Sequence, residues 1–234
     1  MDYWYYYLQR REECRQRVRS RHRLSDKPLV VYFPTYAGGG HAERGVKINE
    51  VYEALKEDYN IFIAPHQMES QAKQKEYLKD LNENLRQRNS TELRVLLNSD
   101  LGSETPYYLW DNPTGIIPDP WEASVHQRLE YMVASDILLG DISGTVLEYL
   151  CTNNPIVLIN KESDSAYFNL NHDVQNPKFD AAEIINFKNI REGIEKALAE
   201  KELLSEKREF WKNYVTGPVD GKCTSRLVDF LETL

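Results

Sequence analysis

The sequence lacks the features that mark a membrane-spanning or a disulfide-stabilised protein. No run reaches the roughly 18 consecutive apolar residues of a membrane span, and no signal peptide precedes the first polar residues. Its three cysteines, Cys14, Cys151 and Cys223, are far apart and have no metal-ligand spacing. An odd number of separated cysteines argues against a disulfide framework. We therefore expect a cytoplasmic protein with reduced thiols.

The common signatures of nucleotide and metal binding are also missing. No glycines have the GxGxxG spacing of a dinucleotide site, and no glycine loop carries the Lys-Ser/Thr of a phosphate loop. No Asp-x-Asp pair marks a metal site. The sequence therefore predicts neither a bound metal ion nor a cofactor, and any phosphate site must use a different pattern.

Charge is distributed unevenly along the chain. Of the 234 residues 41% are hydrophobic, which is enough for a substantial core, and the net charge is −8. Residues 1–27 carry eight Lys/Arg against four Asp/Glu, or +4, which leaves −12 for the remaining residues. An acidic body repels a phosphate backbone, so nucleic acid is not expected as a partner.

The basic segment at residues 1–27 begins with aromatic residues, Tyr3 to Tyr7, and continues as RREECRQRVRSRHR. This pattern indicates a helix and leaves three interpretations open. The helix packs on the domain through its aromatic side chains, or it meets anionic lipid head groups at the inner face of the membrane, or it is a linker. The lack of a continuous apolar face from Glu12 to Arg23 argues against deep membrane insertion.

The stretch from Ala134 to Asn160 predicts a strand-helix-strand unit. Residues 136–140 form an apolar strand, a helix of about seven residues opens at Thr145, and a second apolar strand covers residues 155–159. Two strands joined by a helix in this way run parallel. The unit therefore predicts a parallel sheet with helices on its faces.

The turn between that strand and its helix has the composition of a phosphate site. Ser143, Gly144 and Thr145 offer backbone N–H groups, two hydroxyls and an unhindered approach at the positive end of a helix dipole. Glu148 follows one turn later, where a carboxylate could accept hydrogen bonds from ribose hydroxyls. The alternative is that Asp141, Ser143 and Thr145 only cap the helix.

A glycine-rich loop follows the first predicted strand, residues 29–33. The loop contains Thr35 and a run of three glycines that includes Gly38 and Gly39, and a helix is expected over residues 46–57. Successive glycines let a backbone approach a ligand closely or let the loop move. Strand, glycine loop and helix in this order again favour a phosphate or a nucleotide.

His66 stands at the end of the next predicted strand, residues 59–64. Ligands bind at the carboxyl edge of parallel strands, so this position favours a ligand contact. Further elements complete one Rossmann-like α/β domain over residues 28–234: helices over 70–88, 126–133, 189–213 and 224–234, a strand over 93–98, a short element over 181–185, and an inserted aromatic loop over 101–121.

The last predicted helix, residues 224–234, offers a second anion site. The segment DGKCTSR places Lys222, Ser225 and Arg226 at its N-terminus, although ordinary helix capping explains these residues equally well. We expect the apolar side chains of this helix to face the core: Leu227, Val228 and Leu231.

Four segments resemble the CDP-glycerol glycerophosphotransferase family, which makes and extends teichoic-acid-like poly(glycerol phosphate) and related capsule polymers. SDILLGDISGTVLEYLCTNNPIVLIN is similar to the core of that family, and DGKCTSRLVDFLE is similar to its C-terminal helix. LVVYFPTYAGG and IFIAPHQ resemble two further family elements and occur in the same order. The resemblance covers residues 28–234.

The resemblance implies the C-terminal, donor-binding half of a GT-B glycosyltransferase. His66 would contact the donor pyrophosphate and take part in catalysis, Ser143 and the amides of Gly144 and Thr145 would hold phosphates, and Glu148 would lie near the ribose. The chain departs from the family where Ala37 replaces an arginine and where Asp-Ile-Ser-Gly replaces Asp-Tyr-Ser-Ser. Nothing in it resembles the family's N-terminal half, which carries the proposed catalytic histidine.

Three functions are consistent with these features. The chain is the donor-binding part of a glycerophosphotransferase-like or glycosyltransferase-like enzyme that needs an N-terminal half or a partner subunit. Alternatively, it is a non-catalytic module that binds a nucleotide or a phosphorylated polyol. A third interpretation is a relative of the UDP-sugar 2-epimerases. The expected partner in the first case is a nucleotide-activated polyol or sugar, such as CDP-glycerol.

Overall fold

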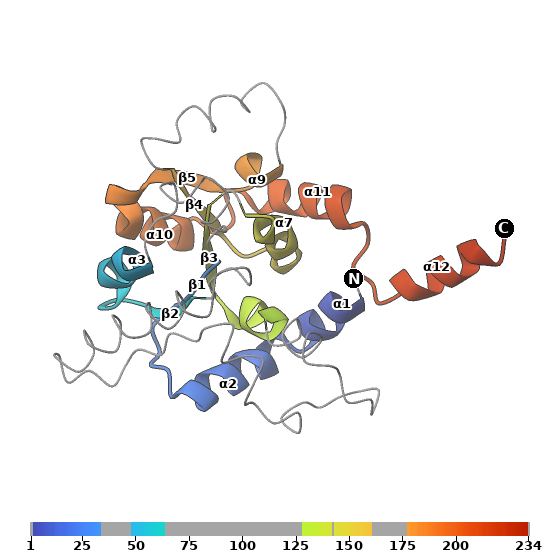
Figure 1. The fold of residues 1–234 in the computed structure, drawn as a ribbon, viewed down its shortest axis with the longest axis horizontal. Helices are drawn as coiled ribbons and strands as arrows, with labels where there is room; N and C mark the ends of the chain where they lie inside the picture. Colours follow the sequence, from blue (N-terminus) through green and yellow to red (C-terminus); the bar gives the residue numbers. More distant parts are fainter. Residues whose placement is uncertain (1, 34–47, 64–127, 142, 161–176, 234) are drawn as a thin grey trace, which may run out of the picture.

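The computed structural model describes residues 2–33, 48–63, 128–141, 143–160 and 177–233 (Figure 1). The expected helix over 70–88, the strand over 93–98 and the loop over 101–121 lie outside these residues. No helix in the described part of the chain is long and apolar enough to cross a membrane.

In the part of the chain that the structure describes, five parallel strands form a single sheet, in the order β2-β1-β3-β4-β5. This arrangement confirms the predicted α/β class with an all-parallel sheet. The strands have these bounds: β1 (Leu29–Tyr32), β2 (Asn60–Ile63), β3 (Ile137–Gly140), β4 (Ile156–Asn160) and β5 (Glu183–Asn186). The first four lie within one residue of the bounds that the sequence predicts, and β5 lies within two residues of the expected short element.

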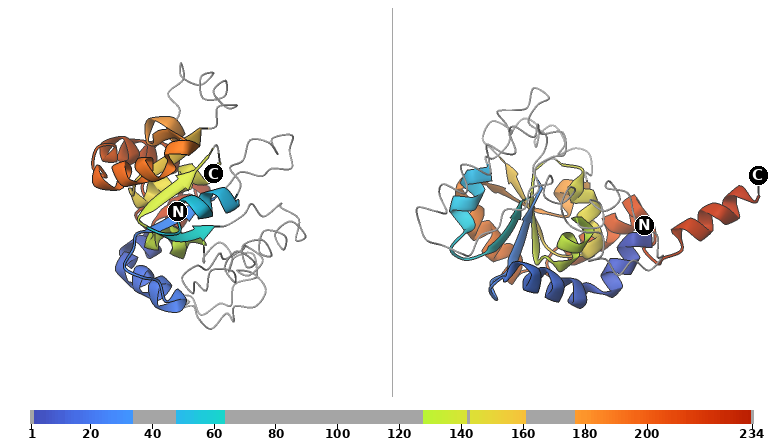
Figure 2. Two further views of the ribbon diagram at one scale, coloured as in Figure 1. Left: turned by 90° about the vertical axis from the view of Figure 1, so that its left-hand side faces the viewer. Right: turned by 60° about the horizontal axis from the view of Figure 1, so that its bottom comes forward.

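Helices cover both faces of the sheet (Figures 1 and 2). One further helical stretch, residues 128–134, precedes β3. The helices have these bounds: α1 (Asp2–Gln9), α2 (Arg11–His22), α3 (Ile48–Leu55), α7 (Thr145–Tyr149), α9 (Pro177–Asp180), α10 (Ile190–Ala199), α11 (Ser205–Thr216) and α12 (Cys223–Leu231), with 3-10 turns at Leu150–Thr152 and Phe187–Asn189.

Successive residues of the central strands enter two different hydrophobic clusters. In β3, Leu138 packs into one cluster, whereas Ile137 and Leu139 pack into the other. Side chains of a strand alternate between the two faces, and a sheet covered on both faces needs apolar residues on each. This requirement explains why β1, β3 and β4 are continuous apolar runs in the sequence.

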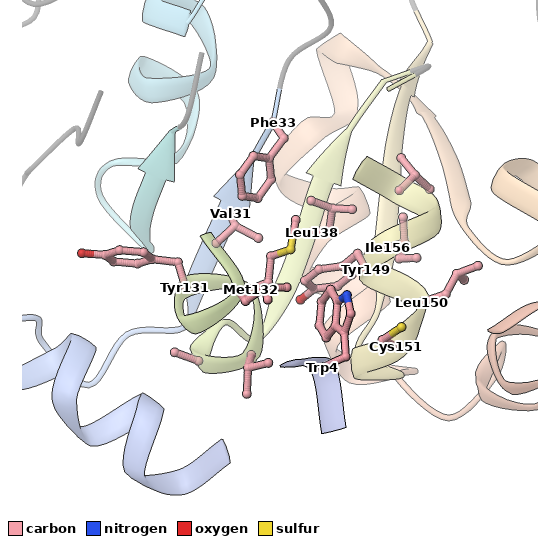
Figure 3. Close-up of a cluster of buried hydrophobic side chains, with 14 of the residues drawn as sticks. Trp4, Val31, Phe33, Tyr131, Met132, Leu138, Tyr149, Leu150, Cys151 and Ile156 are labelled. Atoms are coloured by element: carbon pink, nitrogen blue, oxygen red, sulfur yellow. The ribbon is translucent and has the colours of Figure 1, made fainter. Parts of the chain in front are cut away.

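One cluster lies between the sheet, the helix over 128–134, α7 and the N-terminal helices. Figure 3 shows Trp4 beside Tyr149 and Cys151, with Met132 and Leu138 nearby. The opposite face is covered by α3 and α10, and Ile190 and Ile194 of α10 are buried there. The core therefore extends on both sides of the strands that lead to the carboxyl edge of the sheet.

The N-terminal helices pack on the domain through both apolar and charged side chains. Trp4, Tyr7 and Val18 are buried in the first cluster. Arg17 Nε and Arg21 Nη1 lie 2.8 and 3.0 Å from the two carboxylate oxygens of Glu130, which is buried. These contacts accord with a helix packed by its aromatic residues, and they direct these two arginines toward the protein rather than toward a lipid surface.

Other arginines of α2 also bind within the chain. Arg15 Nη2 lies 2.9 Å from Asp136 Oδ1, and Arg11 donates to the Thr152 carbonyl. Asp136 Oδ2 in turn accepts a 2.8 Å hydrogen bond from the Leu29 amide. The basic segment thus fastens α2 to the starts of β1 and β3.

The C-terminal part of the chain differs from the sequence prediction in two respects. The helix expected over 189–213 is divided by a turn at residues 200–204 into α10 and α11. The expectation that the apolar side chains of the last helix face the core is wrong, because α12 projects from the domain (Figures 1 and 2) and exposes Leu227, Val228, Phe230 and Leu231. No described residue covers this apolar face.

Candidate functional site

The predicted turn lies at the carboxyl edge of the sheet, between the end of β3 and the start of α7. Gly140 is the last residue of β3, and a Cβ there would meet Val146 Cγ2 at 3.3 Å and Leu158 Cδ2 at 3.4 Å. The missing side chain therefore allows α7 to pack closely on β3 and β4. In open parallel sheets this edge is where ligands bind.

Hydrogen bonds within the turn satisfy part of its own backbone. Asp141 Oδ1 accepts from the Ser143 amide at 2.9 Å, and Ser143 Oγ accepts from the Thr145 amide at 3.3 Å. Ser143 Oγ also donates to Thr145 Oγ1 at 3.1 Å. The hydrogen bonds from the Ser143 and Thr145 amides to Asp141 and Ser143 are those expected if these residues cap the helix. Among the described residues, none accepts a hydrogen bond from the Gly144 amide.

Gly144 leaves open space at this helix end. Its φ is −62° and its ψ is −24°, which are helical values, and a Cβ built on it would meet no atom within 4 Å. The backbone conformation at this position therefore does not require a glycine. What its lack of a side chain provides is an unobstructed approach to the first turn of α7.

Glu148, expected near a ribose, forms an ion pair that the sequence did not predict. Arg128 Nη2 lies 3.1 Å from Glu148 Oε2. Arg128 belongs to the helix before β3, and its contact with Glu148 of α7 places it near the carboxyl edge of the sheet, like the turn. Its position one helix length before an apolar strand is the only sequence signal that would have pointed to it.

Lys178 is a second cation that the sequence interpretation missed. It belongs to α9, which contacts α7. Burial lowers the pKa of the Lys178 ammonium group, and the Asp141 carboxylate opposes that shift by favouring the charged form. Lys178 therefore places positive charge beside the turn. In the sequence Lys178 comes well after β4, and no recognised motif connects it with the Ser143 turn.

The proposed second anion site at α12 is already filled from within the chain. Asp2 Oδ1 accepts from the Cys223 amide at 2.8 Å, and Asp2 Oδ2 accepts from the Thr224 amide and hydroxyl at 3.0 and 2.6 Å. The Thr224 hydroxyl and these amides lower the pKa of Asp2 to about 2. The carboxylate of Asp2 thus takes the place that an external anion would need.

The remaining side chains of that group are also separate from the turn. Arg226 Nη1 binds both carboxylate oxygens of Asp220, at 3.0 and 2.9 Å. Lys222, just before α12, and Ser225, within it, are exposed, and this helix projects away from the domain (Figure 1). The structure therefore does not bring Lys222, Ser225 or Arg226 to the Ser143 turn.

Four predicted site residues lie outside the described residues: Thr35, Gly38, Gly39 and His66. The strands that precede them in the chain, β1 and β2, run parallel to β3. These strands end at the same edge of the sheet as β3 does. The roles of the four residues stay predictions.

Comparisons with known proteins identify the fold. No protein-family model matches the sequence, and no curated protein matches it. Among solved structures, the wall teichoic acid polymerase TagF after a soak with CDPG is similar over 100% of this chain and 49% of that one, with 16% identity and a TM-score of 0.58. Another TagF structure gives a TM-score of 0.55 over 94% of this chain and 47% of that one, with 16% identity.

A further similar structure is the C-terminal CMP-Kdo binding domain of WaaA from Acinetobacter baumannii. It covers 86% of this chain and 96% of that one, with 16% identity and a TM-score of 0.49. The fold is the five-stranded parallel α/β fold of C-terminal GT-B glycosyltransferase domains. The chain spans about half the length of the TagF structures that it matches.

Proposed function

We propose that this chain is the donor-binding domain of a glycerophosphotransferase-like enzyme of cell-surface polymer synthesis, and that its ligand is a CDP-glycerol-like nucleotide. The observation that carries the proposal is the likeness of the whole chain to about half of TagF. The four family-like segments support it, because one of the two more specific segments forms the turn at the carboxyl edge of the sheet.

The turn supplies the phosphate contacts in this proposal. The Gly144 amide, which no described residue engages, and the Thr145 hydroxyl donate to a phosphate at the start of α7. The Ser143 hydroxyl joins them by rotating its single proton from Thr145 Oγ1 to the phosphate. Lys178 adds positive charge beside them, which is relevant because the family's arginine is replaced by Ala37 in this sequence. His66 contacts the pyrophosphate, and the loop with Thr35, Gly38 and Gly39 approaches the donor.

The reaction supported by this arrangement is phosphoryl transfer. An acceptor hydroxyl attacks the β-phosphorus of the donor, a new P–O bond forms, and CMP leaves with the electrons of the broken bond. Such a reaction asks little covalent chemistry of the protein, since positioning and charge neutralisation lower most of the barrier. The base that removes the acceptor proton is assigned to an N-terminal half or a partner subunit.

The chain alone is expected to bind nucleotide and to show negligible transfer. Calorimetric titration with CDP-glycerol, CMP, UDP and UDP-sugars measures nucleotide binding. Release of CMP from CDP-glycerol measures transfer. Binding of the cytidine ligands without turnover supports the proposal. Preferential binding of UDP and UDP-sugars would instead favour the epimerase-like alternative. Turnover by the chain alone would contradict the assignment of the base to another half.

Ser143→Ala and His66→Ala are each expected to weaken nucleotide binding by about 1–3 kcal/mol, the range for hydrogen bonds to charged groups. Neither change removes a buried apolar group that the structure describes, so the melting temperature should stay near that of the parent. Calorimetry and thermal unfolding on the same samples measure both quantities. Unchanged affinity in both variants would return the turn to the capping interpretation.

A further inference from the structure

The last two helices, α11 and α12, each carry an apolar ridge that no described residue covers. On α11, Phe210 and Tyr214 are 59% and 75% exposed, and on α12, Leu227 and Leu231 are each 57% exposed. Both pairs are four residues apart, which places their members on one face of the helix, one turn from each other. Such i, i+4 ridges are the surfaces through which one helix packs on another.

The apolar residues of α12 are confined to one side of the helix. Val228 and Phe230 flank the ridge and are exposed with it, whereas Asp229 lies on the opposite side of the helix. A helix of nine residues is not stable in water by itself, and most helical stability comes from packing of the apolar face. The α12 helix therefore gains stability from any partner that covers this side.

The start of α12 is fastened to α1. The carboxylate of Asp2 accepts from the amides of Cys223 and Thr224, and a Cβ on Gly221 would meet a ring carbon of Tyr5 at 2.7 Å. These contacts set the direction in which α12 leaves the domain (Figure 1), and in this direction its ridge does not cover the ridge of α11. Both ridges of one chain thus stay open to a partner.

The exposed apolar area of the two helices matches a small interface. Aromatic side chains bury about 150–250 Å² each when fully covered, so three that are more than half exposed offer roughly 300–450 Å². Four aliphatic side chains add roughly half as much. Two copies would together bury roughly 900–1,300 Å², the size of a weak, reversible interface. The residues are Phe210, Tyr214, Val215, Leu227, Val228, Phe230 and Leu231.

We propose that a second copy of this chain covers these ridges. The ridge of α12 in one copy packs on the ridge of α11 in the other, and a two-fold axis repeats the contact. This arrangement covers both ridges of both copies and closes at two chains. An anionic lipid surface is disfavoured as the occupant, because Asp229 and Glu232 make α12 acidic near its apolar side. The inference goes beyond the proposed function, since the association requires no nucleotide.

Sedimentation equilibrium of the full chain without nucleotide tests the inference. The parent should show a monomer–dimer equilibrium with a dissociation constant of about 10 μM, as expected for a small interface. Tyr214→Glu and Leu231→Glu should each weaken it at least about tenfold, because each places a charge in an apolar contact. Both side chains are exposed, so the circular dichroism spectra should match the parent spectrum.

Ser225→Glu is the matched control on α12. It adds the same charge to the same helix, but Ser225 is exposed on the side away from the ridge. The dissociation constant of this variant should therefore stay within about twofold of the parent value. An equally large loss in Ser225→Glu would mean that net charge, and not the ridge, controls the association, and the inference would be wrong.

A mixture of the two ridge variants shows which helices meet. The Tyr214→Glu chain keeps an intact ridge on α12, and the Leu231→Glu chain keeps one on α11. Their mixture should form a heterodimer through one intact contact, weaker than the parent dimer but stronger than the dimer of either variant alone. A mixture that associates no better than its components would show that α11 and α12 do not pair.

A parent chain that stays monomeric up to about 200 μM would also overturn the inference. Sedimentation with phosphatidylglycerol vesicles then tests the other occupant. Binding of the parent, without binding of Leu231→Glu, would identify a lipid surface as what covers α12.

Discussion

Gly144→Asp should abolish nucleotide binding and leave the protein folded. The new carboxylate would stand at the first turn of α7, where the proposed donor phosphate meets the Gly144 amide. Two unit charges of like sign about 4 Å apart repel by about 4 kcal/mol near a protein surface, so binding should weaken by roughly 100-fold or more. Calorimetric titration with CMP and CDP-glycerol measures the effect.

The backbone and its surroundings allow this substitution. Gly144 has a φ of −62°, and a Cβ added to it would have no neighbouring atom within 4 Å, so the Asp side chain introduces neither backbone strain nor a clash at Cβ. Asp in the first turn of a helix also interacts favourably with the helix dipole. The melting temperature should therefore be near or above that of the parent.

Gly144→Ala is the control for the charge of the side chain that Gly144→Asp introduces. It adds the same Cβ without a carboxylate, and its affinity should stay within a few fold of the parent value. A folded Gly144→Asp variant that binds CMP and CDP-glycerol as tightly as the parent would show that the donor phosphate is not held at this turn. The assignment of Ser143 and Thr145 to the donor would then fail as well.

Removal of residues 2–23 should destabilise the domain severely. Trp4, Tyr7 and Val18 are buried in the core cluster, and each contributes about 1.5–3 kcal/mol through burial of apolar surface. The deletion also leaves the carboxylate of Glu130 buried without Arg17 and Arg21, at a further cost of about 3 kcal/mol or more. These losses approach the entire stability of a typical domain, about 5–15 kcal/mol. Urea unfolding followed by circular dichroism measures the change.

Removal of residues 223–234 is the matched control at the other end of the chain. The side chains of α12 are exposed, and its first turn is held mainly by hydrogen bonds to Asp2 and Asp220. This deletion should shift the urea midpoint only slightly. If the deletion of residues 2–23 were equally mild, the N-terminal segment would be a linker or an accessory helix rather than part of the core.

The sequence alone was sufficient for the class of the fold and for the placement of the central turn. Short apolar runs such as residues 136–140 and 155–159, joined by a short helix, predict a parallel sheet covered on both faces. Because the turn over residues 140–145 joins the end of a strand to the start of a helix, its hydroxyls and its glycine are expected at the carboxyl edge of the sheet. These features are local, because strand and helix periodicity and the direction of a strand follow from neighbouring residues.

Only the tertiary structure determined the charged partners of these elements. Asp2 and Thr224 lie 222 positions apart in the sequence yet bind each other, and Arg17 and Glu130 are separated by 113 positions. Arg128 and Lys178 likewise reach the vicinity of the turn from other elements. Ion pairs and hydrogen bonds between distant residues depend on how helices pack on the sheet, and no periodicity in the sequence encodes that packing. The same reason explains α12: its amphipathic pattern predicts an apolar face, whereas the tertiary arrangement leaves that face exposed in this chain.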